Sequence, residues 1–247
     1  MAFSRGAAMS AAETSAFSVL TNIIAAPSRA YAAIQEKPTV WLPLLILIVS
    51  YCAISFVYTH LVDLPWLIEQ QLSNARNLTD AQRDQALKAA IRLPPAVYGG
   101  ISAVSSTAFI VVFLALTALY YRGISFATGD GVKYKQWFSL ASWCAVPIVF
   151  GIIASLVHLL SGDARFMTQE EMNPFAFGNL LGIERGPSTP IAQRVLLGLD
   201  VTALWSLALS VLGYHTFSKR SLLVSAAVVL GPVVVIVAGV AAVVATR

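Results

Sequence analysis

The chain has 247 residues, of which 57% are apolar and only 11% are charged, and its formal net charge is +4. Soluble domains carry roughly 25% charged residues, so the composition excludes an ordinary soluble protein and predicts a membrane protein. The basic residues lie at the ends of apolar segments rather than in one patch, which argues against nucleic acid as a partner.

The chain begins with a polar leader followed by an amphipathic segment. Residues 1–16 are small and polar, which predicts a disordered leader. Between residues 17 and 37, an apolar stripe recurs at steps of three and four residues and consists of Phe17, Leu20, Ile24, Pro27, Tyr31 and Ile34. Pro27 favours two short helices, the second beginning at this proline. Two interpretations stay open, a helix in the membrane interface and a helix packed beneath the bundle.

Five apolar runs follow, each of about 20 residues or more, which is enough to cross a hydrocarbon core of ~30 Å as a helix. They cover about residues 39–58, 97–121, 137–160, 195–217 and 222–245. The predicted fold class is therefore an all-α polytopic membrane protein with five transmembrane helices and an N-terminal interfacial amphipathic helix. Residues 17–247 are predicted to form a single membrane domain.

The segments between the runs carry local signals. Thr79 and Gln82 fit a capping box, which predicts a short solvated helix over 80–92. Pro147 near the middle of the third run predicts a kink, and Pro232 lies inside the fifth. Only residues 218–220 separate the fourth and fifth runs, so these two helices are expected to form a tight antiparallel hairpin. Cys52 and Cys144 are expected to be buried thiols without a disulfide.

The expected orientation has a cytoplasmic N-terminus and a C-terminus on the other side of the membrane. Lys and Arg number eight on each side in this arrangement, but the two short loops, 122–135 and 218–220, carry five of the inside residues. Basic residues in short loops tend to stay in the cytoplasm. An odd number of crossings then puts the C-terminus outside.

No catalytic motif is present, and the three histidines lie near predicted helix ends, so neither an enzyme, a metal site nor a cofactor is expected. Asp200 is the one acid within a predicted run, and Tyr214 shares its helical face. Asp200 is either a headgroup, proton or cation contact facing the bundle, or an N-terminal carboxylate favoured by the helix dipole. Pro147 and Pro232 either hinge a gate or shape packing.

Several short motifs occur in a characteristic order over about residues 17–240: Lys37-Pro38 before Trp41-Leu42-Pro43, then Lys135-Gln136-Trp137, Pro147, Leu199-Asp200, Gly213-Tyr214 and Gly231-Pro232. Together with five runs they resemble the bacterial branch of the Yip-domain family. The resemblance implies a five-helix bundle in a bacterial inner membrane, with a cytoplasmic N-terminus and a periplasmic C-terminus. Eukaryotic members are associated with Rab GTPases, but this chain has no long region before its first run, so that role is not carried over.

Two functions are expected from this pattern. The first is a non-enzymatic inner-membrane protein that organises membrane or partner proteins, with lipids, other proteins or a second copy as partners. The alternative is transport or lipid handling in a cavity near Asp200. A single acid near the interface is little equipment for a coupled pump, which favours the first.

Overall fold

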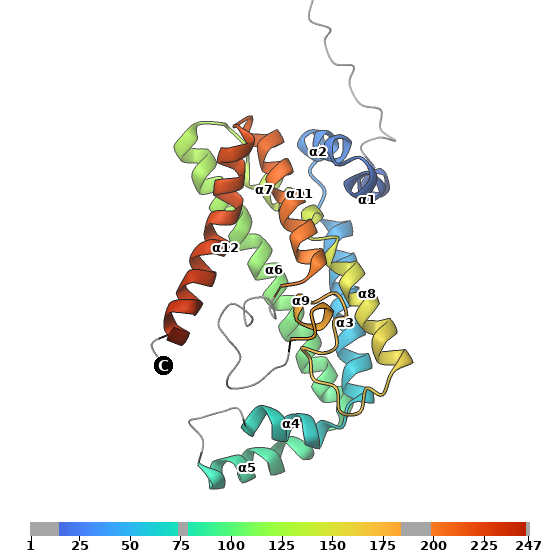
Figure 1. The fold of residues 1–247 in the computed structure, drawn as a ribbon. Coiled ribbons are helices and arrows are strands. Elements are labelled where there is room, and N and C mark those ends of the chain that lie inside the picture. Colours follow the sequence, from blue (N-terminus) through green and yellow to red (C-terminus); the bar gives the residue numbers. More distant parts are fainter. Residues whose placement is uncertain (1–14, 74–78, 184–198, 246–247) are drawn as a thin grey trace, which may run out of the picture. The chain divides into compact units, whose positions relative to one another are not determined.

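The computed structural model describes residues 15–73, 79–183 and 199–245, and the regular elements in these ranges are α-helices (Figure 1). Their residues form two compact units. Unit 1 is built from the described parts of Met1–Leu45, Val112–Pro147 and Ala203–Arg247, and unit 2 from those of Ile46–Val111 and Ile148–Thr202. The predicted disordered leader, residues 1–16, lies almost entirely outside the described residues.

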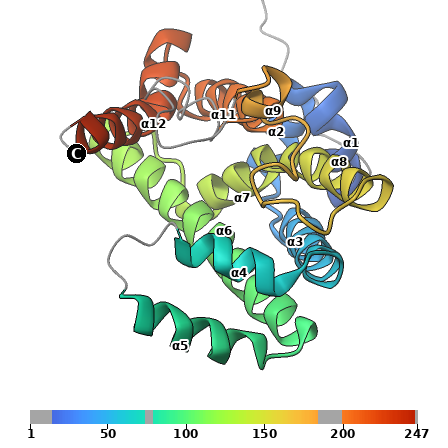
Figure 2. The same ribbon diagram turned by 60° about the horizontal axis from the view of Figure 1, so that its bottom comes forward.

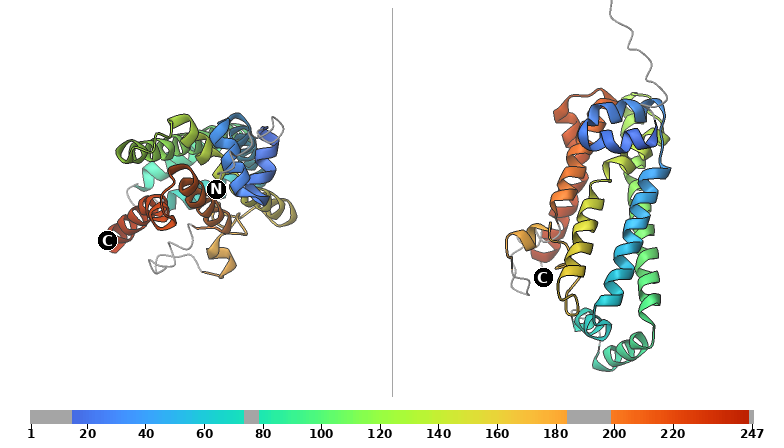
Figure 3. Two further views of the ribbon diagram at one scale, coloured as in Figure 1. Left: turned by 90° about the horizontal axis from the view of Figure 1, so that it is seen from above. Right: turned by 90° about the vertical axis from the view of Figure 1, so that its right-hand side faces the viewer.

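Unit 1 contains α1 (Ala16–Ala25), α2 (Pro27–Glu36), α7 (Tyr134–Cys144) and α12 (Leu222–Ala245), with the first residues of α3 (Trp41–Leu61), the last part of α6 (Pro95–Thr128) and most of α11 (Val201–Ser218). The Ser15 hydroxyl caps α1 by accepting from the Ser18 N–H at 3.1 Å. Pro27 is the first residue of α2, as predicted. Both short helices contact α7, and they run across the direction of α12 (Figure 3).

Unit 2 contains α4 (Leu64–Ser73), α5 (Asp80–Ile91), α8 (Ile148–Ser161) and the short α9 (Phe177–Leu180), with the rest of α3 and the first part of α6. The helices α4 and α5 lie side by side as a hairpin (Figure 2). The predicted capping box of α5 is confirmed, because the Thr79 hydroxyl accepts from the Gln82 N–H and the Gln82 side chain accepts from the Thr79 N–H. The helix α4 was not predicted.

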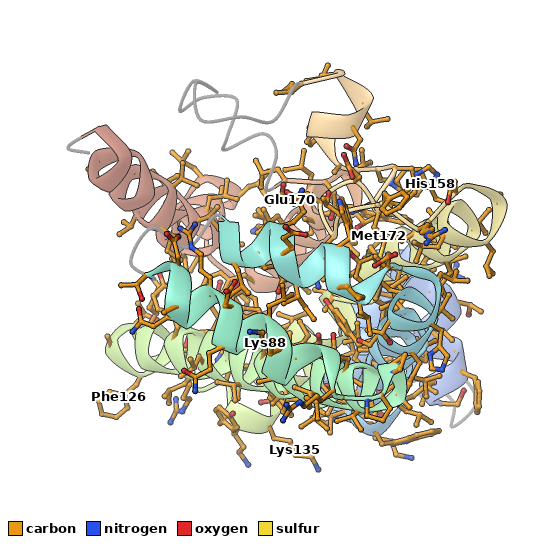
Figure 4. All side chains as sticks on the ribbon, turned by 90° about the horizontal axis from the view of Figure 1, so that it is seen from below. Lys88, Phe126, Lys135, His158, Glu170 and Met172 are labelled. Carbon is orange, nitrogen blue, oxygen red and sulfur yellow. The ribbon has the colours of Figure 1, made fainter. Side chains whose placement is uncertain are left out.

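The core of unit 2 joins these helices to the loop after α8. It consists of Ile54, Tyr58, Val62, Leu64, Leu67, Ile68, Ile152, Leu159 and Ala164. Leu87 of α5 and Met172 of the loop pack against it, and Figure 4 labels Met172 beside Glu170. The loop is therefore a packed part of unit 2.

Four helical stretches in the described residues are long and apolar enough to cross a membrane, namely Trp41–Leu61, Pro95–Thr128, Tyr134–Ser161 and Leu222–Gly239. The chain is therefore a multi-pass membrane protein. The helix α11, which corresponds to the predicted fourth span, is not among the four, and the polar run Tyr214-His215-Thr216 lowers its hydropathy. We therefore treat a membrane crossing by α11 as a proposal.

The two prolines inside apolar stretches behave differently. The Tyr134–Ser161 stretch is interrupted before Pro147, where residues 145–147 form a turn between α7 and α8, so the predicted distortion is confirmed. Proline lacks an N–H and its ring clashes with the preceding turn, which explains the break. Pro232, by contrast, lies within α12, which continues through it. Cys52 and Cys144 are both free, but only Cys144 is buried as expected, because Cys52 is half-buried.

Candidate functional sites

The amphipathic segment formed by α1 and α2, called the amphipathic leader from here on, is the first candidate site. The structure divides its predicted apolar stripe into a buried and an exposed part. Tyr31 and Ile34 of α2 are buried, with 1% and 0% of their surface exposed. Phe17 and Ile24 of α1 are 66% and 39% exposed, and Leu20 is half-buried. The expectation of one continuous face is wrong in this respect, because the non-helical Ala26 separates the helices. The inward side of α1 is instead formed by Val19 and Ile23.

Tyr31 fastens α2 to α11. Its phenol donates to the main-chain carbonyl of Leu209 at 2.7 Å, and burial raises the pKa of Tyr31, so the hydroxyl stays a donor at neutral pH. The ring lies against Gly213, where an added Cβ would come within 3.1 Å of Tyr31 Cε1 and 2.5 Å of Leu140 Cδ1. A small residue at position 213 thus permits the close approach.

The helix α7 holds the segment that joins α2 to α3. The carbonyl of Thr39 accepts from the Ser139 hydroxyl at 2.7 Å and from the indole N–H of Trp143 at 2.9 Å. The Gln136 side-chain amide donates to the carbonyl of Gln35 at 3.1 Å. These bonds to main-chain carbonyls hold the C-terminal end of α2 and the residues after it against α7.

Tyr214 belongs to a buried aromatic cluster in unit 1. Its ring is stacked on Trp137 with 5.0 Å between centroids, and Tyr121 and Phe217 lie within 5.5 Å of one or both rings. Trp137 and Tyr214 are 0% and 1% exposed. The cluster joins α6, α7 and α11, so Tyr214 serves packing in this structure.

Asp200 anchors the loop after α8 in unit 2. It immediately precedes α11, which begins at Val201, so the expectation that it lies about five residues inside a helix is wrong; residues 195–198 lie outside the described residues. Its carboxylate accepts from the Thr202 hydroxyl at 2.6 Å and from the Asn173 amide at 3.2 Å. Because Asp200 holds the Asn173 side chain of the loop and the Thr202 hydroxyl, it stays outside the helix, which begins at the next residue.

Main-chain pairing reinforces this anchor. The N–H of Phe177 donates to the carbonyl of Leu199 at 3.0 Å, and the N–H of Val201 donates to the carbonyl of Phe175 at 3.2 Å, which makes an isolated antiparallel bridge. The Asn179 amide adds donors to the carbonyls of Glu170, Glu171 and Asn173 at 3.0, 3.3 and 2.7 Å. The side-chain amides of Asn173 and Asn179 therefore organise the loop. In the sequence, Asn-Pro at 173–174 predicts a turn but not these contacts.

A second clamp ties the same loop to the end of α3. Asp63 and Arg165 form an ion pair at 3.4 Å, and the N–H of Asp63 donates to the carbonyl of Arg165 at 2.8 Å. The Tyr58 hydroxyl donates to the carbonyl of Met167 at 2.9 Å. Across the described ranges, no group of three His, Cys, Asp or Glu side chains is placed to hold a metal ion.

Charge differs between the two units. The described residues of unit 1 carry seven basic and two acidic side chains, and those of unit 2 carry four basic and eight acidic ones. The unit 1 set is Arg29, Lys37, Arg122, Lys133, Lys135, Lys219 and Arg220, with the acids Glu36 and Asp130. Basic enrichment is typical of the cytoplasmic ends of membrane helices.

Comparison with known proteins identifies the family. The model of the Yip1 domain matches residues 21–244. The chain belongs to the Yip1 domain family. It is similar to "Membrane protein YknW" of Bacillus subtilis (strain 168), with 26% identity over 220 residues and 87% of each chain covered. No solved structure matches this Yip1-domain protein.

The family match covers the sites described above. It begins within α1 and ends within α12, so it includes Tyr31, Gly213 and Asp200. The resemblance inferred from the order of motifs is thereby confirmed.

Proposed function

We propose that this Yip1-domain protein is a non-enzymatic protein of the bacterial inner membrane that organises membrane or partner proteins, with the leader as its contact surface. One observation carries the proposal. Phe17, on the exposed side of α1, packs edge-on against Trp41, with 6.4 Å between ring centroids. Trp41 is itself 54% exposed and begins a helix that is long enough to cross the membrane.

Tryptophan at the start of a spanning helix favours the interface between headgroups and acyl chains. A phenylalanine beside it lies at the same depth, so α1 presents Phe17 and Ile24 to the membrane surface. Since Tyr31 and Ile34 are buried, α2 holds α1 in this position. The leader would thus lie in the membrane plane as a docked platform rather than as a free tail.

The proposed topology has five crossings, with α11 as the fourth, a cytoplasmic N-terminus and a periplasmic C-terminus. The basic surplus of unit 1 and the basic residues of the two short loops support this orientation. Lipid tails would cover the outward faces of α6 and α12, where Val104, Leu223 and Val235 are 71%, 81% and 70% exposed. Protein partners or a second copy would then meet the platform or the loops.

The alternative, transport or lipid handling near Asp200, has less support. The carboxylate of Asp200 already accepts from Asn173 and Thr202, and these bonds organise a loop. Pro147 is buried at the turn between α7 and α8, which fits a role in packing. For Pro232, both a hinge of a gate and a role in packing stay open.

Site-directed spin labelling of the full chain in vesicles tests the platform. Labels at positions 17 and 24 are expected to be more accessible to oxygen, which concentrates in acyl chains, than to a water-soluble nickel complex. A label at Ser28, an exposed polar position on α2, is the matched control and should favour nickel. Nickel accessibility at positions 17 and 24 equal to that at 28 would reject the in-plane leader.

A further inference from the structure

Several helix ends meet at one end of unit 1. Here α2, α6 and α11 end at Glu36, Thr128 and Ser218, while α7 and α12 begin at Tyr134 and Leu222. Two hydrogen bonds join these segments. Gln136 donates to the carbonyl of Gln35 at 3.1 Å, and the Arg220 guanidinium donates to the carbonyl of Thr128 at 2.9 Å. The helix ends of unit 1 can be followed in the view from above in Figure 3.

Exposed cations are concentrated at this end, which we call the basic end. It is defined by Lys37, Lys133, Lys135, Lys219 and Arg220, all of which are exposed. Within the part of the chain that the structure describes, none of these five forms an ion pair. Of the two acids of unit 1, Asp130 accepts from the hydroxyls of Ser125 and Thr128. Glu36 and Asp130 oppose these five cations, so the basic end keeps a net positive charge.

Aromatic side chains lie beside these cations. Phe126 is 79% exposed, and the Arg122 guanidinium lies over its ring, 5.9 Å from the centroid. Tyr134 is 41% exposed, stands between Lys133 and Lys135 in the sequence, and stacks on Phe138 with 6.0 Å between centroids. Exposing the apolar surface of an aromatic ring to bulk water is unfavourable, whereas aromatic rings and basic side chains are both favoured at headgroup depth.

We propose that the basic end binds the phosphate headgroups of anionic phospholipids. Lysine and arginine donate charge-assisted hydrogen bonds to phosphate oxygens, and basic residues at a membrane surface attract anionic lipids. The cations occur on separate segments around the ends of the apolar helices, where lipid headgroups lie, and the exposed rings favour lipid over an acidic protein segment. The inference rests on the proposed function only in that this end lies at the membrane surface.

The test measures which lipids remain with the full chain. The protein is placed in vesicles of equal parts phosphatidylglycerol and phosphatidylcholine, extracted gently, and its bound lipids are counted by native mass spectrometry at low salt. The test variant is Lys133→Gln with Lys135→Gln. Its control is Lys88→Gln with Arg92→Gln, two exposed basic residues of unit 2; Figure 4 labels Lys88 and Lys135. Circular dichroism checks that each variant keeps its helices.

The wild type is expected to retain phosphatidylglycerol over phosphatidylcholine, and the test variant to lose about fivefold of that preference per lysine, which corresponds to ~1 kcal/mol each. The control should keep the wild-type preference. An equal loss in both variants, or no preference in the wild type, would overturn the proposal. If the test variant keeps the preference for phosphatidylglycerol and an added acidic peptide abolishes that preference, the basic end would instead be assigned to a protein partner. None of these outcomes changes the spin-label result, so the two proposals fail separately.

Discussion

Replacing Tyr31 with Phe removes one hydroxyl from the contact that fastens the leader to α11. The phenol donates to the carbonyl of Leu209 at 2.7 Å, and Tyr31 is 1% exposed, so no water can replace the bond without movement. A buried hydrogen bond of this kind contributes about 0.5–1.5 kcal/mol. The equilibrium for undocking α2 should therefore shift about 2- to 13-fold toward the open state.

Trypsin cleavage after Arg29 measures this opening. Arg29 is exposed, but it lies in the first turns of α2, and a protease needs an unfolded segment. When opening is fast relative to cleavage, the cleavage rate follows the population of the open form. Tyr31→Phe should therefore speed cleavage of the detergent-solubilised chain by the same 2- to 13-fold factor. Tyr31→Ala, which also removes the ring, should speed it by more than about 100-fold, given ~3–5 kcal/mol for such truncations.

A matched control is Tyr134→Phe, since the Tyr134 hydroxyl is exposed and its bond to the carbonyl of Ala115 is long, at 3.4 Å. This variant should be cleaved after Arg29 at the wild-type rate. Wild-type cleavage of Tyr31→Phe, or equal acceleration by Tyr134→Phe, would refute the reasoning that a buried hydrogen bond holds the leader in place.

Three further predictions follow from the described contacts. Gly99→Ala should lower the free energy of unfolding of the solubilised chain by about 1–3 kcal/mol, because the new Cβ would come within 2.7 Å of Phe56 and 2.8 Å of Thr59. Gly100→Ala, whose Cβ meets nothing within 4 Å, should raise this free energy by up to ~1 kcal/mol. A fall in melting temperature for both would contradict this packing. Asp200→Asn should speed Glu-C protease cleavage after residues 170 and 171, because Asn173 and Thr202 donate to different carboxylate oxygens and the amide keeps only one of them; unchanged cleavage would remove the anchoring role. Cysteines introduced in 122–135 should resist an impermeant reagent added to intact cells, and those in 80–92 should react; the reverse pattern would invert the proposed topology.

Local signals in the sequence predicted the elements they act on. Pro27 begins α2, the Thr79–Gln82 box begins α5, and Pro147 follows the end of α7, because each effect acts within one helical turn. The helix α4 was missed, although the Asp63 carboxylate caps it by accepting from the Trp66 N–H at 3.2 Å. Asp63 before Leu64-Pro65 is a typical signal for the start of a helix, so the local sequence does indicate α4.

Contacts between distant residues were beyond the sequence pattern. Tyr31 and Leu209 are 178 positions apart, and no periodicity connects them. The apolar stripe of the leader could not reveal that α2 would be buried while Phe17 stayed exposed, since hydrophobic spacing gives a face but not what covers it. The apolar residues on both sides of Asp200 predict that it lies inside a helix. Its contacts with Asn173 and Thr202, which keep it outside α11, cannot be seen in that pattern.

The length of α6 sets a limit on how the chain fits its bilayer. Its 34 residues extend ~51 Å at 1.5 Å per residue, against a hydrocarbon core of ~30 Å. Tilting the whole helix into the core would need an angle of more than about 50°, beyond the usual range of up to ~40°. Several turns of α6 must therefore stand outside the acyl chains. A thicker or thinner bilayer would therefore change which turns of α6 lie among the acyl chains, without a change in the length of the helix.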